Sequence, residues 1–138
     1  MASPFRHPVD VRYLEVDQQG VVFNMWYFAY LDEAMAAFLR HGGLPYPEML
    51  AGGHDVQLVH TDLDWRGSLA YGERGEVEVA LARLGRTSFT LDFAVTAGDR
   101  VVATASTVYV VVGTDGSGKR EVPPAIRDAL GEVRPLHR

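Results

Sequence analysis

A long and almost wholly apolar helix is the feature that most constrains how this chain can fold. The sequence predicts it between Asn24 and Gly43, where apolar residues recur at the i, i+3, i+4, i+7 spacing of one helical face. Asn24 is the expected N-cap, and the two glycines at 42 and 43 are expected to end the helix. The main apolar face consists of Tyr27, Tyr30, Leu31, Ala34 and Phe38. Within the helix only Asp32, Glu33 and Arg40 are charged. So narrow a polar stripe indicates burial on most sides, and therefore a structure that encloses the helix.

Residues that alternate between apolar and polar supply that enclosing structure. A first strand is predicted within 5–15, starting after Pro8, because proline suits the start of a strand better than its middle. Four further strands are predicted over 54–65, 76–84, 89–96 and 101–112, and short helices over 48–51 and 123–130. Consecutive strands beside one helix predict the α+β class, with an antiparallel five-stranded sheet curled around the helix.

Association through the sheet is also expected. The run Val108–Val112 is continuously apolar, which is typical of a central strand covered on both faces. The sheet has open edges, and open edges favour pairing with a second copy of the chain.

Length, composition and charge exclude several classes of protein for this chain. The 138 residues fit a single domain over 1–138, and the absence of cysteine excludes disulfides and thiol chemistry. A net charge of −5 argues against a nucleic-acid partner. No apolar run approaches the ~20 residues of a membrane span. The N-terminal residues also lack the apolar core of a signal peptide. We therefore expect a cytoplasmic protein without a membrane partner.

The segment VRYLEVDQQGVVFNMWYFAYLDEA, residues 11–34, resembles the start of hotdog-fold acyl-CoA thioesterases of the 4-hydroxybenzoyl-CoA thioesterase type. That family's run is Asp, two variable residues, Gly, two apolar residues, an aromatic, one polar residue and an aromatic-rich helix. Here the run is filled by Asp17, Gly20, Val21, Val22, Phe23, Asn24 and Tyr27. The resemblance continues through residues 63–96 and 101–112. It implies a single hotdog domain that hydrolyses acyl-CoA thioesters.

By this resemblance, Asp17 is the catalytic carboxylate, acting either as a nucleophile on the thioester carbonyl or as a general base on water. The backbone N–H at or near Asn24 would polarise the thioester oxygen. Free N–H groups and the positive end of a helix suit a developing oxyanion. Relatives often carry Tyr or His at the position of Asn24. The backbone role therefore transfers to Asn24 more readily than a side-chain role in acid–base chemistry.

The resemblance also implies substrate contacts. Gly20 serves either the turn alone or also the approach of the backbone to a ligand. Val21 and Tyr27 adjoin the expected pocket, with a place in the core as the alternative for Tyr27. Arg86 and Ser88 match the turn that relatives use for the nucleotide end of coenzyme A, and the arginine fork suits phosphate. A solvated hairpin is the alternative interpretation of these two residues. Coenzyme A is part of the substrate, so no separate cofactor is expected.

Several alternatives stay open. Asp32 and Glu33 compete with Asp17, because another branch of hotdog enzymes places its carboxylate on the central helix. Two alternative functions are also open. The chain could be an acyl-CoA hydratase or dehydratase on the same fold, or a non-catalytic protein that binds acyl-CoA or an acyl carrier. The five histidines lack metal-ligand spacing, so no metal site is expected. The resemblance also implies a homodimer, paired into a homotetramer, with the site at a subunit interface.

Overall fold

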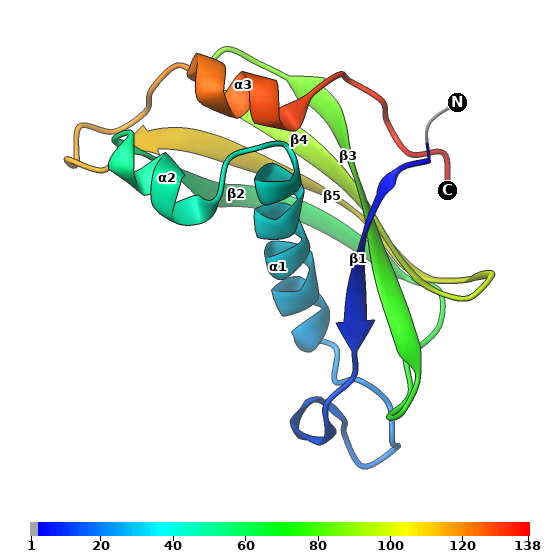
Figure 1. Cartoon of the computed structure of the whole chain (residues 1–138). Helices are drawn as coiled ribbons and strands as arrows, with labels where there is room; N and C mark the ends of the chain where they lie inside the picture. Colours follow the sequence, from blue (N-terminus) through cyan, green and yellow to red (C-terminus); the bar gives the residue numbers. More distant parts are fainter. Residues whose placement is uncertain (1–2) are drawn as a thin grey trace.

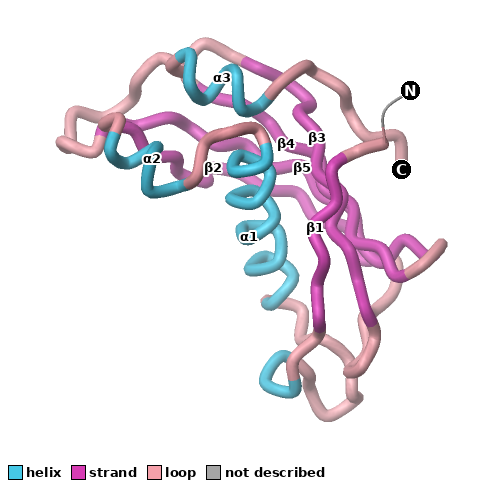
Figure 2. The backbone as a smooth tube through the Cα atoms, viewed as in Figure 1, coloured by secondary structure: helices cyan, strands magenta, loops and turns pink. Residues whose placement is uncertain are grey.

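A curved sheet of five antiparallel strands encloses one long helix in the computed structural model, which describes residues 3–138 (Figure 1). The strands are β1 (Phe5–Asp10), β2 (His54–Trp65), β3 (Arg74–Leu84), β4 (Ser88–Ala97) and β5 (Arg100–Gly113), and their order in the sheet is β1-β3-β4-β5-β2. The helices are α1 (Trp26–His41), α2 (Tyr46–Ala51) and α3 (Pro124–Leu130), with a 3-10 turn, η1, over Tyr13–Glu15. This arrangement confirms the predicted α+β class with a five-stranded antiparallel sheet around one helix (Figure 2).

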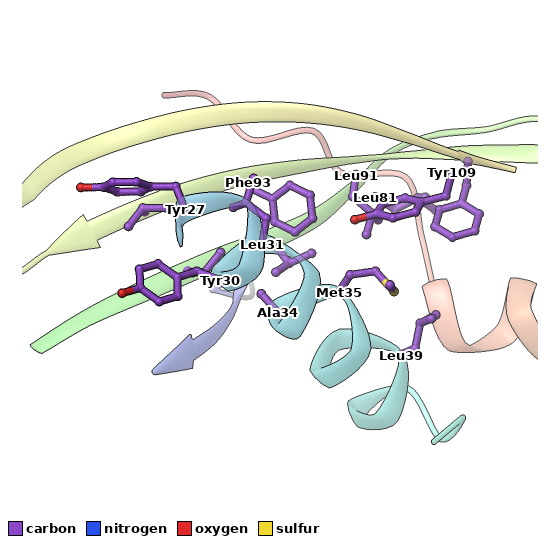
Figure 3. Packing of buried hydrophobic residues seen from close by; sticks show 14 of the residues in the cluster. Tyr27, Tyr30, Leu31, Ala34, Met35, Leu39, Leu81, Leu91, Phe93 and Tyr109 are labelled. Carbon is purple, nitrogen blue, oxygen red and sulfur yellow. The ribbon is translucent and has the colours of Figure 1, made fainter. Parts of the chain in front are cut away.

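The apolar face of α1 forms the centre of the core. Its buried residues are Tyr27, Tyr30, Leu31, Ala34, Met35, Ala37 and Leu39. They pack against the inward-facing side chains of the sheet, including Leu81, Leu91 and Phe93 (Figure 3). Burying one large apolar side chain contributes roughly 1.5–3 kcal/mol. Burial of this face is therefore a major part of the stability of the fold.

The sequence predicted the C-terminal end of α1 correctly and its N-terminal end wrongly. The helix ends at His41, and Gly43 has a φ of +101°, as the two glycines indicated. The start was predicted wrongly: Met25 is the N-cap, and no side chain caps the helix. A turn precedes the helix, with the Trp26 N–H donating to Phe23 O at 2.9 Å, so Asn24 lies in that turn.

Two strand predictions also need correction. Pro8 lies inside β1, opposite Glu76, and not before its start. This is possible because β1 is an edge strand, whose outer side needs no ladder hydrogen bond. In β2 a bulge between Leu58 and His60 shifts the register, so His60 does not share the inner face with Leu58.

The outward face of β5 is less covered than expected. The strand is internal, between β4 and β2, but Val108 and Val110 are half-buried. The expectation that this apolar run is covered on both faces therefore fails for the isolated chain.

The C-terminal segment, residues 132–138, crosses the outer face of the sheet. The backbone N–H of Arg134 donates to Leu81 O at 2.7 Å. Arg138 forms an ion pair at 2.7 Å with Glu78, which is only 1% exposed and also pairs with Arg6 at 3.0 Å. Glu78 is thus a buried, doubly paired carboxylate on the side of the sheet opposite α1.

We predict that Gly42→Ala destabilises the protein by about 1–3 kcal/mol, as overpacking typically does. A Cβ at Gly42 would overlap the backbone of Ala129 in α3, so α3 would have to shift away from α1. Chemical denaturation of the variant measures the loss. Gly67→Ala is the matched control, because a Cβ there meets no atom within 4 Å. Equal stability of the two variants would contradict the prediction.

Candidate active site

The segment from Val16 to Val22 folds back on itself as a tight hairpin at the start of α1. Val16 and Val22 form an antiparallel bridge, and the Asp17 N–H donates to Val21 O at 2.9 Å. The turn closes where the Gly20 N–H donates to Asp17 O at 3.0 Å. Gly20 has a φ of +77°, a conformation that glycine adopts without strain. The turn itself therefore accounts for a glycine at this position.

Asp17 presents its carboxylate to solvent. One oxygen, Oδ1, accepts a hydrogen bond from the Gln19 N–H at 2.8 Å. Within residues 3–138 the other oxygen, Oδ2, has no hydrogen-bond partner. The backbone thus orients the carboxylate while one oxygen stays available to a substrate or a water molecule.

Two backbone N–H groups are free at the start of α1. In the part of the chain that the structure describes, neither Asn24 nor Met25 donates its N–H to another residue. The first N–H of the helix, that of Trp26, is already bonded to Phe23 O. Unpaired N–H groups at the positive end of a 16-residue helix form a suitable site for a developing negative charge.

A second loop, residues 66–73, supports the hairpin from the side. The Val22 N–H donates to Leu69 O at 2.8 Å, and the Tyr71 N–H donates to Gly20 O at 3.0 Å. Val21 also forms a bridge with Ala70. The hairpin is therefore held along its length by main-chain bonds to a segment that lies far away in the sequence.

Two tyrosines on α1 attach these loops to the helix. The Leu69 N–H donates to the Tyr27 hydroxyl at 3.1 Å, and the Tyr30 hydroxyl donates to Glu15 Oε1 at 2.7 Å. Figure 3 shows both hydroxyl groups pointing toward the end where α1 begins. Burial raises the pKa of both tyrosines, so they stay protonated at neutral pH. Tyr27 is fully buried, and its hydroxyl contacts the loop of residues 66–73.

Glu15 is the residue of this region that sequence reasoning missed. Its side chain is buried, with 3% of the residue exposed, and it accepts hydrogen bonds from the Arg12 N–H at 2.9 Å and Arg12 Nε at 2.8 Å. Burial by itself raises the pKa of Glu15, but the bonds from Arg12 and Tyr30 outweigh it and lower the pKa below its ordinary value of 4.5. The i, i+3 spacing to Arg12 is the one local signal of this contact in the sequence.

The structure places Arg86 and Ser88 far from Asp17 within one chain. The hairpin contacts Leu69 and Ala70, before β3 begins, whereas Arg86 follows the last residue of β3. β3 has 11 residues, so its two ends lie about 35 Å apart. Arg86 is exposed, 3.6 Å from the Glu121 carboxylate, and Ser88 starts β4. A single chain does not bring the two groups of predicted residues together.

The competing carboxylates and the histidines lie elsewhere. Asp32 and Glu33 are exposed on α1, and the protein atoms around Asp32 raise its pKa by desolvation. His41 is at the opposite end of α1, with its ring 4.9 Å from Phe5. Over residues 3–138, no three His, Cys, Asp or Glu side chains are grouped so that they could hold a metal ion. None of the helices in that range is long and apolar enough to cross a membrane.

A cavity of about 860 Å³ lies between the C-terminal segment, β1 and β3, with Phe5, Phe38 and Leu81 among its lining residues. None of the predicted site residues lines it. The candidate site is instead an open surface around Asp17 and the start of α1.

The chain is similar to known proteins over most of its length. The profile of the Thioesterase-like superfamily matches residues 11–130. A putative esterase from Aquifex aeolicus is 35% identical over 91% of this chain and 99% of its own length. A 1,4-dihydroxy-2-naphthoyl-CoA hydrolase from Synechococcus elongatus is 25% identical over 87% of this chain and 90% of its own length. The crystal structure of a hypothetical protein from Aquifex aeolicus superposes with a TM-score of 0.88 at 32% identity, covering 93% of this chain and all of the other.

We predict that the stabilising effect of Glu15 disappears in acid. Its folded-state pKa is lower than the unfolded value near 4.5, so its contribution is complete above that pH and is lost as the pH falls through the folded-state pKa. The free energies of unfolding of the wild type and Glu15→Gln should therefore differ most near neutral pH and converge below 4.5. Urea denaturation across this range measures the difference. A difference that stays constant throughout would contradict the prediction.

Proposed function

Because the chain belongs to the Thioesterase-like superfamily, which makes it an enzyme of the thioesterase class, we propose that it hydrolyses acyl-CoA thioesters to a free acid and coenzyme A. The observation that carries this proposal is the pairing of two groups in one short segment. The exposed carboxylate of Asp17 and the free N–H groups of Asn24 and Met25 belong to the same hydrogen-bonded stretch. Both groups suit the chemistry of a thioester carbonyl.

In the proposed reaction the thioester oxygen accepts hydrogen bonds from the N–H groups at the start of α1. Asp17 then either attacks the carbonyl carbon, giving an acyl anhydride that water hydrolyses, or removes a proton from a water molecule that attacks directly. In both routes the C–S bond breaks and the coenzyme A thiolate takes up a proton. One oxyanion donor of this kind is worth roughly 3 kcal/mol. The reaction needs neither a metal ion nor a thiol of the protein.

The proposal includes a dimer formed through β2. This strand is an edge of the sheet, and three of its large apolar side chains, Leu58, Val59 and Trp65, are 51%, 56% and 44% exposed. A 12-residue edge with exposed apolar groups is a template for pairing with an identical strand. A two-fold axis at β2 makes the contact self-complementary and closed. By the resemblance, two such dimers pair into a tetramer.

A two-fold axis at β2 also accounts for the separation of the site residues. Antiparallel pairing sets Trp65, at the end of β2, beside the start of β2 in the partner. That start pairs with the end of β5, and Val110 of β5 pairs with Ser88. The hairpin that carries Arg86 of the partner subunit would then lie on the side where this chain presents Asp17. In this arrangement Arg86 and Ser88 bind the nucleotide end of coenzyme A across the interface.

The rival enzyme on this fold, a hydratase, needs a histidine with a carboxylate in the cleft. His41 is a full helix length from Asn24, and His60 faces away from α1, bonded to Asp62 at 3.1 Å. The positions of these side chains support hydrolysis over hydration. Turnover of any thioester by the protein would exclude the non-catalytic alternative.

We predict that Asp17→Asn lowers kcat on acyl-CoA substrates by about 10²-fold or more, equivalent to roughly 2.7 kcal/mol of transition-state stabilisation. The change keeps the size of the side chain and removes its charge and basicity. Release of free thiol from short-chain, long-chain and aryl acyl-CoAs measures the rate.

Asp32→Asn is the matched control for Asp17→Asn, and its kcat should stay near the wild-type value. A loss of activity in Asp32→Asn alone would show that the catalytic carboxylate is Asp32 on α1 and not Asp17. Binding of acyl-CoA without turnover in any variant would favour the non-catalytic alternative.

We further predict that Asp17→Asn and Arg86→Ala complement each other when they are co-expressed. If Asp17 and Arg86 of one site come from different subunits, a mixed dimer contains one intact site and one doubly altered site. Only the intact site of each mixed dimer should regain wild-type kcat/KM, so the mixture should be clearly more active than either variant alone while staying below the wild type. If both residues of a site come from one subunit, every site keeps a defect and no activity returns. That result would overturn the interface arrangement.

A further inference from the structure

The buried carboxylate of Glu15 is an unusual feature next to the candidate site. Three donor groups surround it at 2.7–2.9 Å: the Tyr30 hydroxyl, the Arg12 N–H and Arg12 Nε. Burying a charged group is costly unless it is paired and hydrogen-bonded, and these partners satisfy that requirement. The donors come from two elements, because Arg12 precedes η1 and Tyr30 belongs to α1.

The position of Glu15 connects this carboxylate to the catalytic segment. Its backbone carbonyl accepts a hydrogen bond from the Phe23 N–H at 2.8 Å. The next residue, Val16, forms the bridge to Val22, and Asp17 follows directly. Glu15 therefore stands at the base of the hairpin, bonded by its backbone to the returning side and by its side chain to α1.

The two ties between the loops and α1 have different targets. Tyr27 bonds to Leu69 in the supporting loop, whereas Tyr30 bonds to Glu15, the last residue before the hairpin. The Tyr30–Glu15 bond is thus the direct side-chain link between the segment that carries Asp17 and the helix whose start carries the N–H groups.

We infer that Glu15 is a positioning residue, which with Tyr30 fixes the distance between the Asp17 carboxylate and the free N–H groups at the start of α1. This inference rests on the proposed thioester hydrolysis, in which both groups act on one carbonyl. A displacement of about 1 Å in a catalytic group can cost about 10² in rate. Loss of the tie should therefore lower kcat more than it changes KM, because the substrate is still bound while the reacting groups are misplaced.

Two variants weaken or remove the tie with little change in volume: Glu15→Gln removes the charge but keeps one acceptor oxygen, and Tyr30→Phe removes the donor. Glu78→Gln is the matched control, because Glu78 is equally buried and doubly ion-paired but lies on the opposite face of the sheet. For each protein, steady-state kinetics gives kcat and KM, and amide hydrogen exchange gives the protection of residues 16–24.

In Glu15→Gln and Tyr30→Phe we expect amide exchange in residues 16–24 to accelerate about tenfold or more, with the strands unchanged. We expect kcat to fall by about 10²-fold and KM to stay within about threefold. Glu78→Gln should lose stability without either change.

Unchanged exchange in residues 16–24 would overturn the inference, and so would accelerated exchange with wild-type kcat. The same loss of kcat in Glu78→Gln would also overturn it, because the effect would then be general destabilisation. If the wild type itself releases no thiol from any acyl-CoA, the proposed function fails. The exchange measurement still decides whether Glu15 and Tyr30 hold the hairpin.

Discussion

The burial of the apolar face of α1 against the curved sheet is the interaction on which the rest of this structure depends. Ala34, at the middle of the helix, is completely buried, and the small side chain allows the helix to approach the sheet closely. The sheet strands contribute inward-facing residues that complete the same core (Figure 3). Because the buried face of the helix is packed against the sheet, the position of the helix along the sheet is fixed, and so is the position of its first turn.

The candidate site takes its geometry from that first turn. Tyr27 and Tyr30 bury their rings in the core, but their hydroxyl groups must find partners because buried polar groups are hydrogen-bonded. They find them in Leu69 and Glu15, one in each of two loops. Helix packing is thereby transmitted to the hairpin that carries Asp17. Each loop also buries an apolar side chain in the core, Val22 in the hairpin and Leu69 in the loop of residues 66–73, so polar and apolar contacts together hold the loops in place.

The predicted catalytic carboxylate and the predicted coenzyme A-binding residues are far apart in one chain, so a single chain lacks a complete site. Asp17 and Arg86 lie beyond opposite ends of β3, so one chain does not bring them together. The exposed apolar side chains of β2 lie along the edge where a second copy would complete the sheet. The arrangement that we propose uses one two-fold axis both to cover this edge and to join the two halves of the site.

The sequence by itself determined the helix, the five strands, their antiparallel arrangement and the segment that contains Asp17 and Asn24. Those features depend on local periodicity and on short motifs, which are readable from neighbouring residues. The tertiary structure alone decided that Met25 caps α1, that Pro8 lies within an edge strand and that Glu15 is buried against Tyr30. The N-cap depends on the turn that Phe23 and Trp26 close just before the helix. The position of Pro8 depends on the place of β1 in the sheet, and the burial of Glu15 depends on a contact with a residue distant in the chain. The residues around Glu15 give no sign in the sequence that a tyrosine fifteen residues later will contact and bind its carboxylate.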